Sequence, residues 1–278
     1  MIRALTFLLV FMPSLAWSTH PQFFFQADDG QHILTPQITG SYGVREFEGN
    51  NEYSYHGAVT GLAYEYGLSK SLSLQGIIRH TYVKIEDSGR HSTVEGLADP
   101  GMTLAGNWNL GLFTLRYGSS LFFSLENSKP SNGFSGEKKL IPYIGFDLNF
   151  GRHFTGLRMS KVVLLEDRKT ENNNGQITKS RGGEDLTIQA FYEVFIKESS
   201  VGVYIFFLED DNYTYQNGTT TNRVNRFGYE FYGSIVLNEN WTLIPSLLYG
   251  TTLDSELGTL DIETYDDYTL RCQFRYTF

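Results

Sequence analysis

The feature that most constrains this chain is an alternation of apolar and polar residues with a period of two. Successive side chains of a β-strand point to opposite faces, so each alternating segment predicts a strand with one apolar and one polar face. Residues 268–278 show the pattern most clearly, because even positions are aromatic, aliphatic or cysteine and odd positions are polar. Twelve such segments of 9–15 residues follow one another: 34–44, 56–68, 72–86, 99–110, 113–126, 140–150, 154–165, 185–195, 200–208, 226–237, 241–253 and 267–278.

The connections between these segments alternate in length. The short ones are residues 67–71, 109–112, 150–153, 196–199 and 237–240. The long ones are polar and cover residues 48–54, 87–97, 127–139, 166–184, 209–223 and 254–266. An even number of strands joined by alternating tight turns and long loops is typical of bacterial outer-membrane barrels. The sequence therefore predicts an all-β fold, a single up-and-down antiparallel transmembrane β-barrel over residues 33–278. We expect twelve strands, or ten or fourteen if one hairpin is merged or split.

A membrane barrel explains the strands better than a soluble sandwich does. In lipid every backbone N–H and C=O must be paired within the protein, so a spanning sheet has to close on itself. A tilted strand of about 9–11 residues crosses the bilayer, whereas strands of soluble proteins average about 5–6 residues. Aromatic residues also gather near both ends of the apolar faces, such as Trp108 and Trp241 near short turns and Tyr82 and Tyr249 near long loops. Two such belts are expected at the two membrane interfaces.

Residues 1–18 predict a cleaved secretory signal peptide. Arg3 supplies the basic start, an apolar run follows, and Ala16 and Ser18 match a small-residue cleavage site, with cleavage after either residue. Together with the barrel pattern, this predicts export to the outer membrane of a Gram-negative bacterium, in contact with outer-membrane lipid and lipopolysaccharide. Residues 19–32 would then be a periplasmic N-terminal segment or a plug.

The end of the last segment resembles the C-terminal signature of bacterial outer-membrane proteins. Phe278 is the final residue, and Tyr276 and Phe274 continue the apolar positions before it. In those proteins the last strand is read by the barrel-assembly machinery. The resemblance implies that Phe274, Tyr276 and Phe278 form an assembly signal and that this machinery is a partner.

The polar face of each strand is expected to line the lumen. An Arg or Lys on the lipid face would cost about 2–4 kcal/mol at mid-bilayer, which explains why the charges share one face. The candidate lumen residues are Arg45, Glu65, Arg79, Asp99, Arg116, Asp147, Arg158, Glu193, Tyr204, Phe206, Glu230, Tyr232, Arg271 and Arg275. We expect Asp147 to lie between Arg116 and Arg158. The charges predict either a constriction that selects solutes or an ion-paired layer. The aromatic members predict a path for an apolar solute, or packing against an inward-folded loop or against residues 22–26.

Two stretches resemble a known family. "YEYGLSKSLSLQ" (residues 64–75) and "EGLADPGMTLAGNW" (residues 95–108) are similar to patterns of the MetA-pathway phenol-degradation family of outer-membrane proteins. The matching residues are Tyr64, Tyr66, Gly67, Leu68, Ser69, Gly96, Leu97, Asp99 and Pro100, with Ala98 in place of the usual Gly. The resemblance implies a transporter loosely akin to long-chain fatty-acid channels.

Other chemistry finds little support. Cys272 is the single cysteine, and no Cys/His spacing typical of a metal site occurs, so we predict no metal and no cofactor. The net charge of −9 disfavours a nucleic-acid partner. An outer-membrane phospholipase would need a serine beside a lipid-facing histidine. His80 faces lipid by parity, but residues 56–68 and 99–110 on the adjacent strands contain no serine. We therefore predict that the protein is not an enzyme.

These patterns predict an outer-membrane channel or transporter, a porin, for passive passage of small solutes, with hydrophobic or aromatic compounds as candidates. The alternative is a structural or adhesive barrel that acts through its extracellular loops. A lipid-modifying enzyme is a remote alternative.

Overall fold

The strands of the computed structural model form a closed antiparallel barrel, which confirms the predicted fold class. The model describes residues 22–47, 51–87, 90–123, 138–166, 168–171, 177–182, 184–210, 213–215, 224–257 and 260–278. Within these residues, twelve strands form the ring and two further strands join its sheet from outside. No helix in the same ranges is long and apolar enough to cross a membrane. The predicted signal peptide lies outside the described residues.

Neighbours in the ring follow one another in the chain once the strands that lie outside the ring are left out. The ring strands are β1 (His32–Phe47), β2 (Asn51–Ser69), β3 (Leu72–Asp87), β5 (Gly101–Asn109), β6 (Phe113–Phe122), β7 (Lys139–Phe150), β8 (His153–Lys161), β12 (Leu186–Ile196), β13 (Ser199–Asp210), β15 (Val224–Val236), β16 (Trp241–Leu257) and β17 (Leu260–Thr277). β17 closes the ring against β1, with Leu34 opposite Tyr276 and Val44 opposite Asp266. The polar and apolar faces of the last segment therefore belong to a fully paired strand.

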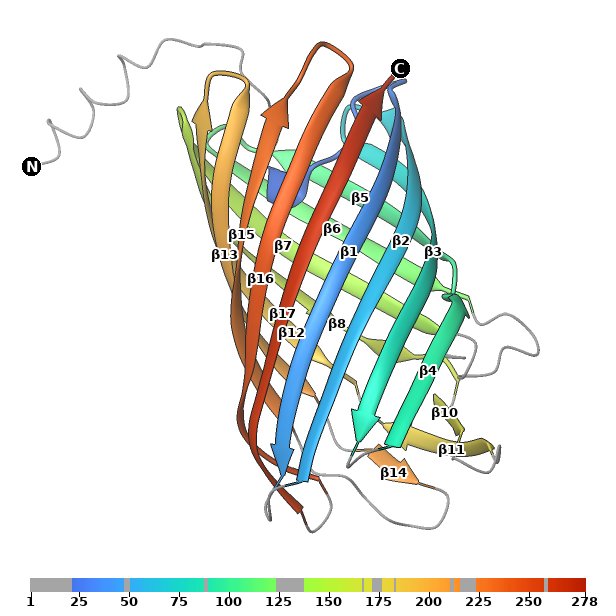
Figure 1. Ribbon diagram of the computed structural model, residues 1–278. Coiled ribbons are helices and arrows are strands. Elements are labelled where there is room, and N and C mark those ends of the chain that lie inside the picture. Colours follow the sequence, from blue (N-terminus) through green and yellow to red (C-terminus); the bar gives the residue numbers. More distant parts are fainter. Residues whose placement is uncertain are drawn as a thin grey trace, which may run out of the picture.

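The two ends of the barrel differ (Figure 1). The short turns and the C-terminus lie at one end, which we call the turn end. The other, which we call the loop end, carries a separate three-stranded sheet of β10 (Arg168–Glu171), β11 (Ile177–Gly182) and β14 (Tyr213–Tyr215). These strands come from two of the predicted long loops, so part of the loop sequence is ordered as its own small sheet.

Several predicted loops are instead continuations of the strands. Residues 87–97 were expected to be a loop, but β4 (Arg90–Leu97) pairs with β3 as far as Asp87 opposite Arg90. β16 and β17 likewise pair as far as Leu257 opposite Leu260, within the expected loop 254–266. The prediction was wrong here because it relied on an apolar face. β4 keeps its backbone ladder with β3 although its described side chains are exposed or half-buried and form no apolar face.

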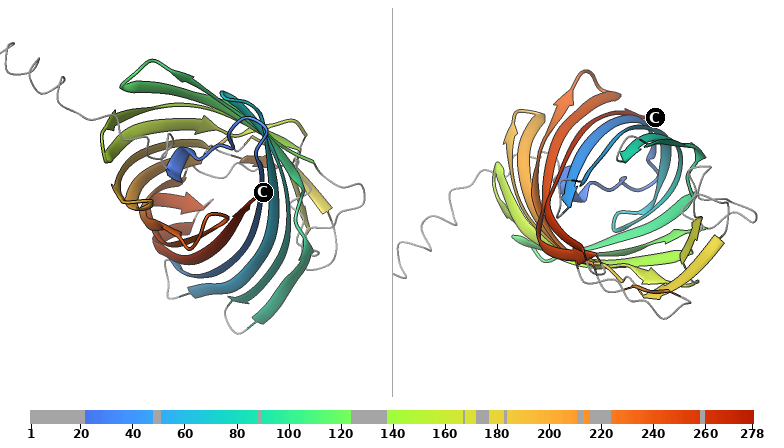
Figure 2. Two further views of the ribbon diagram at one scale, coloured as in Figure 1. Left: turned by 90° about the horizontal axis from the view of Figure 1, so that it is seen from above. Right: turned by 60° about the horizontal axis from the view of Figure 1, so that its bottom comes forward.

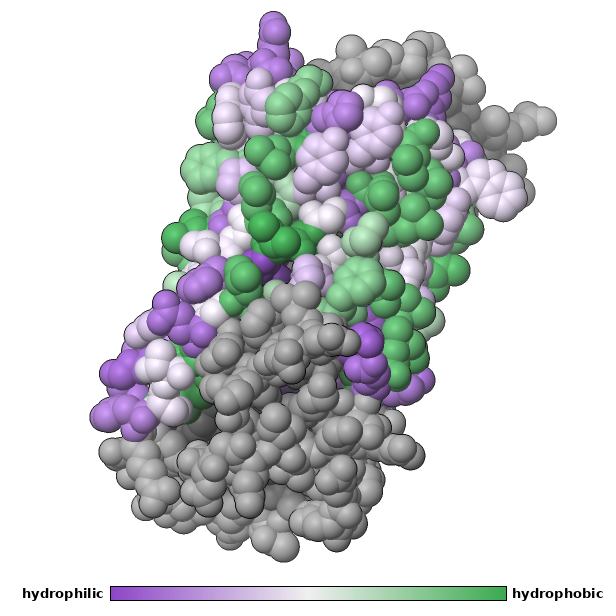
Figure 3. Space-filling model, turned by 90° about the vertical axis from the view of Figure 1, so that its right-hand side faces the viewer, coloured by the Kyte–Doolittle hydropathy of each residue, from purple (hydrophilic) through white to green (hydrophobic). Residues whose placement is uncertain are grey.

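The barrel is apolar outside and charged inside. Ile78, Phe231 and Leu270 are 55–63% exposed on the outer face, whereas Asp147 and Glu193 are at most 1% exposed. Figure 3 shows hydrophobic side chains spread over the barrel wall and hydrophilic ones towards its upper edge. Soluble proteins rarely expose apolar patches larger than a few hundred Å², whereas lipid-facing strands alternate apolar-out and polar-in. The surface therefore fits a lipid environment.

The N-terminal segment runs inside the barrel at the turn end. A short 3₁₀ helix, η1 (Gln22–Phe24), lies within the ring when the molecule is seen along its axis (Figure 2). The segment then reaches β1 beside Gly67, whose N–H donates to the Gln31 carbonyl at 3.0 Å. A Cβ on Gly67 would lie 1.7 Å from the Asp28 carbonyl oxygen. Only glycine therefore allows this close approach of segment and strand.

Candidate functional site: the lumen

Two buried carboxylates hold the backbone of the N-terminal segment. The Gln22 N–H donates to Glu193 Oε1 at 3.0 Å, and the Ala27 N–H donates to Glu65 Oε1 at 2.9 Å. Glu193 also accepts hydrogen bonds from the Ser200 hydroxyl at 2.6 Å and the Tyr232 hydroxyl at 3.0 Å. Hydrogen bonds to charged acceptors contribute about 1.5–3 kcal/mol each, more than neutral ones. Both carboxylates therefore fix the segment as well as line the wall.

An aromatic cluster packs the same segment against β8, β12 and β13. Phe23 stacks on Phe191 with ring centroids 4.6 Å apart, and it meets Tyr204 at 5.2 Å. Phe24 contacts Phe191 edge-on at 5.5 Å and lies in the same buried cluster as Phe154 and Phe195. Such ring pairs contribute about 0.5–1.5 kcal/mol each beyond the area that they bury. The cluster fills the turn end of the lumen on this side.

Two arginines lie over phenylalanine rings of the N-terminal segment. The guanidinium of Arg275 lies 3.3 Å from the centroid of Phe25, and that of Arg116 lies 5.7 Å from the centroid of Phe24. Arg116 Nε also donates to Asp147 Oδ2 at 2.6 Å, and both side chains are almost fully buried. The turn end is therefore a packed layer of arginines, carboxylates and phenylalanine rings.

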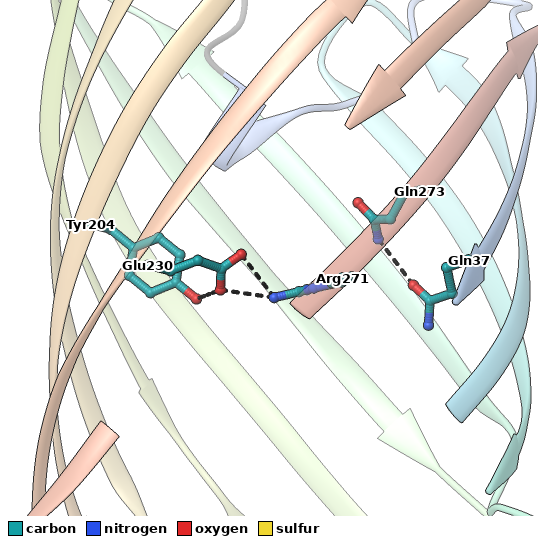
Figure 4. A network of polar contacts seen from close by, with 5 residues as sticks. All are labelled: Gln37, Tyr204, Glu230, Arg271 and Gln273. Carbon is teal, nitrogen blue, oxygen red and sulfur yellow. Dashed lines mark hydrogen bonds and ion pairs between the residues drawn. The ribbon is translucent and has the colours of Figure 1, made fainter. Parts of the chain in front are cut away.

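A second group of charges lies farther from the turn end. Arg271 donates to both carboxylate oxygens of Glu230 at 2.8 and 2.9 Å, and Tyr204 donates to Glu230 at 2.5 Å (Figure 4). Gln273 donates to Gln37 at 2.9 Å in the same view. This network is partly exposed to the lumen, since the Arg271 side chain is 33% exposed.

The ion pair of Arg226 and Asp267, at 2.6 Å, spans β16 in the same way as that of Arg271 and Glu230. Gly250 on β16 lies opposite Asp267, and a Cβ there would approach the Asp267 Oδ1 atom to 2.3 Å. The glycine leaves the space that these side chains need to meet across an intervening strand.

Arg158 differs from the other lumen arginines. We expected it near Asp147, but the register of β7 and β8 puts Arg158 opposite Gly145 and Asp147 opposite Gly156. The Arg158 guanidinium instead lies 4.3 Å from the centroid of the Tyr143 ring. Its buried Nε has no hydrogen-bond partner.

Two cavities flank Arg158 and Phe23, which line both of them. One has a volume of about 260 Å³ and is also lined by residues such as Glu65, Thr103, Arg116 and Tyr143. The other has a volume of about 210 Å³ and is also lined by residues such as Gln189, Tyr204, Glu230, Arg271 and Gln273. The lumen is therefore not fully filled by side chains, and the N-terminal segment borders both spaces.

The other residues predicted from the sequence lie as follows. Eight candidates are buried: Glu65, Asp99, Arg116, Asp147, Glu193, Glu230, Tyr232 and Arg275. Five are half-buried: Arg79, Arg158, Tyr204, Phe206 and Arg271. The side chain of Arg45 lies outside the described residues. Phe274 and Phe278 are exposed on the outer face, and Tyr276 packs between Trp241 and Phe278 at 4.7 and 4.8 Å. That these residues line a conducting path, or form an assembly signal, stays a prediction.

Sequence reasoning missed several residues of the site. Gln37, Gln273 and Ser200 were not singled out, although each makes a side-chain hydrogen bond in the lumen. Their parity was a sufficient signal, because each shares the inner face of its strand with residues that were chosen as lumen candidates. In the ranges that the structure covers, no group of three or more His, Cys, Asp or Glu side chains is arranged to hold a metal ion.

Several solved structures are similar to this chain in fold. The COG4313 outer membrane channel from Pseudomonas putida F1 matches with a TM-score of 0.73 and 13% sequence identity, over 94% of this chain and 100% of that chain. The two proteins share a fold. The translocator domain of the autotransporter NalP from Neisseria meningitidis matches with a TM-score of 0.54 and 12% identity, over 92% of this chain and 91% of that chain. The transport unit of the autotransporter AIDA-I from Escherichia coli has a TM-score of 0.54 and 11% identity, over 98% and 97%.

No protein-family model matches the chain, and no curated protein matches it in sequence. At 11–13% identity, the likeness to solved structures concerns the fold alone. The resemblance to the MetA-pathway phenol-degradation family therefore stays a prediction.

Proposed function

We propose that this protein is an outer-membrane channel for the passive passage of small solutes. The observation that carries the proposal is a closed barrel with an apolar exterior whose interior holds charged groups and two cavities. A barrel that serves only as a structural element gains nothing from unfilled space lined by arginine and carboxylate groups. The fold shared with the COG4313 outer membrane channel supports the same function and an outer-membrane location.

The turn end would face the periplasm, and residues 22–31 would act as a plug there. The support is their position inside the ring and their bonds to Glu65 and Glu193. Solutes would pass through the cavities beside Phe23 when the segment shifts. The aromatic side chains around those cavities, including Tyr143 and Tyr204, suit solutes with an apolar or aromatic body.

Single-channel recording in planar bilayers tests the channel. The full-length protein should give discrete conductance steps, and deletion of residues 22–27 should enlarge them, because the deletion removes η1 and the rings of Phe23, Phe24 and Phe25 from the lumen. Liposome swelling with sugars and with aromatic solutes supplies a second readout. Absence of both conductance and swelling for the full-length protein and for the deletion would refute the proposal.

A loop-based function is the second candidate. Its support is the small sheet of β10, β11 and β14 at the loop end, which gives the loops an ordered surface. Deletion of residues 166–184 separates the two functions. A channel should keep its conductance after the deletion, whereas an adhesive barrel should lose binding to cells or matrix.

One feature supports a channel over a lipid-modifying enzyme. On the outer face of β3, His80 lies opposite Thr60, and the shallow groove around it is lined by Leu62, Ile78 and Leu97 as well. Among the described residues, no side-chain hydrogen bond to His80 occurs, so nothing orients it as a catalytic base would be oriented.

The exposed aromatic end of β17 would serve the barrel-assembly machinery, and replacing Phe278 with Ala should reduce the amount of assembled barrel in membranes.

A further inference from the structure

Arg158 lies beside both lumen cavities. It lies on β8, between Gly145 of β7 and Gln189 of β12, and it lines both cavities together with Phe23. A solute in either cavity is therefore close to this side chain. Among the described residues no other arginine lines both spaces, because Arg116 lines the first and Arg271 lines the second.

The guanidinium of Arg158 has unused hydrogen-bonding capacity. Arg116, Arg226 and Arg271 each form an ion pair with a carboxylate. Within the part of the chain that the structure describes, no carboxylate lies within ion-pair distance of Arg158, and its Nε is buried without a partner. A guanidinium carries five N–H donors and keeps its charge in proteins. Leaving such donors buried and unpaired is costly, so an oxyanion that enters the cavities gains by meeting them.

The surroundings of Arg158 indicate which oxyanion fits. The face of Tyr143 lies against the guanidinium, and the rings of Phe23 and Tyr204 line the adjoining spaces. Arg binds carboxylates through two parallel hydrogen bonds, and planar rings stack on aromatic walls. The volumes of about 260 and 210 Å³ lie below the ~300–1,000 Å³ of pockets for drug-sized ligands, which limits the solute to a small molecule.

We propose that Arg158 is a binding station for the carboxylate of small aromatic acids on their way through the barrel. The carboxylate accepts from the guanidinium, and the ring lies against Tyr143, Phe23 or Tyr204. This inference rests on the proposed channel function and adds a solute class to it. It also gives Arg158 a role different from that of the ion-paired arginines, which stabilise the wall.

Equilibrium binding to the purified full-length protein in detergent tests the station directly. Isothermal titration calorimetry should show that benzoate binds at least about tenfold more tightly than benzyl alcohol, since only benzoate offers the charged acceptor. Arg158→Gln should lower benzoate affinity by about tenfold or more, and Arg158→Lys should lose less because the charge remains. Inorganic phosphate should bind more weakly than benzoate. Equal affinity of phosphate and benzoate would overturn the aromatic class of solute.

Arg79→Gln is the matched control. Arg79 is also a lumen arginine with a buried, unpaired Nε, but it lines neither cavity and lies 5.5 Å from the Phe122 ring. The Arg79→Gln substitution removes the same charge as Arg158→Gln. Its benzoate affinity should therefore fall by less than about threefold, as expected for a screened charge at a distance. Equal losses in both variants would mean that benzoate senses only the overall field, and the station would be refuted. Heat-dependent gel mobility confirms that each variant is folded.

Planar bilayers separate this inference from the channel proposal. Added benzoate should reduce the current of the unmodified protein at concentrations that leave Arg158→Gln unaffected. Benzoate binding that depends on Arg158, in a protein that never conducts, would support the station and refute the channel. Normal conductance with no benzoate effect and no benzoate binding would support the channel and refute the station.

Discussion

The turn-end layer and the mid-lumen layer use the same residue types but neutralise their charges differently. In the turn-end layer, Glu65, Arg116, Glu193 and Arg275 are buried and contact the N-terminal segment, and Asp147 is buried against Arg116. In the mid-lumen layer, Arg226 pairs with Asp267 and Arg271 pairs with Glu230 across β16, and the second pair lines a cavity. Charges at the turn end thus serve packing, whereas the two arginines of the mid-lumen layer stay partly exposed although their carboxylate partners are largely buried.

The difference has a physical cause. A twelve-stranded barrel is wider than the eight-stranded barrels whose own side chains fill the interior. Its lumen therefore needs additional chain to be closed at any level, and among the described residues this chain is found at the turn end, as η1 and the residues that follow it. Farther along the lumen, the side chains of Arg226 and Arg271 stay 25% and 33% exposed. If burial decides how strongly each layer stabilises the barrel, removing one charge should cost more at the turn end than in the mid-lumen layer.

The largest effect is expected for the buried ion pair of the turn-end layer. Arg116→Ala leaves Asp147 buried without its partner, which should lower the free energy of unfolding by about 3–5 kcal/mol. Denaturant unfolding in detergent micelles measures the loss. Replacing both residues with leucine should recover part of it, because an apolar pair needs no compensation. A loss below about 1 kcal/mol for Arg116→Ala, as for exposed pairs, would erase the distinction between the layers.

The second prediction concerns the close contact between the N-terminal segment and Gly67 of β2. Gly67→Ala puts a methyl group 1.7 Å from the Asp28 carbonyl oxygen, so residues 27–31 must move away. Hydrogen exchange of the Gly30 amide, which donates to the Gly67 carbonyl at 2.9 Å, should speed up strongly. Gly76→Ala is the matched control on β3, because a Cβ there meets nothing within 4 Å. If both substitutions accelerate exchange equally, the close contact at Gly67 is not what holds the segment.

Much of this architecture was accessible from the sequence. The alternation in residues 267–278 predicted β17 and the orientation of its faces, the count of alternating segments predicted twelve strands, and the alternating lengths of the connections predicted the up-and-down barrel. The alternation works because lipid outside and polar groups inside act on every residue of a spanning strand. It fails where a strand has no continuous apolar face in its sequence, so β4 and the outer parts of β16 and β17 were taken for loops.

The partners of the lumen residues were harder to predict from the sequence. Parity put Arg158 and Asp147 on inner faces, but the register of β7 and β8 separates them by one residue pair on that face. Register depends on the turn and on the stagger of the whole ring, and neither can be read from one strand. Residues 22–26 suggested a plug by composition. The hydrogen bonds of Ala27 to Glu65 and of Gln22 to Glu193 join positions 38 and 171 residues apart, which no local pattern predicts.

The third prediction concerns the ion pair of the mid-lumen layer. Arg226→Ala removes a partner of Asp267, but the two side chains are 25% and 12% exposed, so water can replace part of the interaction. The free energy of unfolding should fall by about 1–2 kcal/mol, less than for Arg116→Ala. Cation selectivity in bilayers should rise, because the Asp267 carboxylate loses its counter-charge beside the lumen. A loss of stability as large as that of Arg116→Ala would show that the layers are equally buried.

The smallest effect is expected at the loop end, beyond both layers. Lys84 Nζ donates to Glu86 Oε1 at 2.8 Å, and this hydrogen bond and charge lower the pKa of Glu86 below its usual value. The contribution of the pair is therefore present above the ordinary pKa of glutamate and is lost as the pH falls through the lowered pKa. Lys84→Ala should raise the pKa of Glu86 towards its ordinary value while stability at neutral pH hardly changes, since exposed pairs contribute little.

An NMR titration of the Glu86 carboxyl carbon measures that pKa directly. His91→Gln is the control, because His91 lies 3.5 Å from Glu86 and lowers its pKa less than Lys84 does. The pKa of Glu86 should therefore rise more in Lys84→Ala than in His91→Gln. An unchanged pKa in Lys84→Ala would mean that the ion pair is not formed in solution. In that case only the pairs inside the barrel, where water is restricted, hold their charges together, and the contrast between the lumen layers and the loop end becomes sharper.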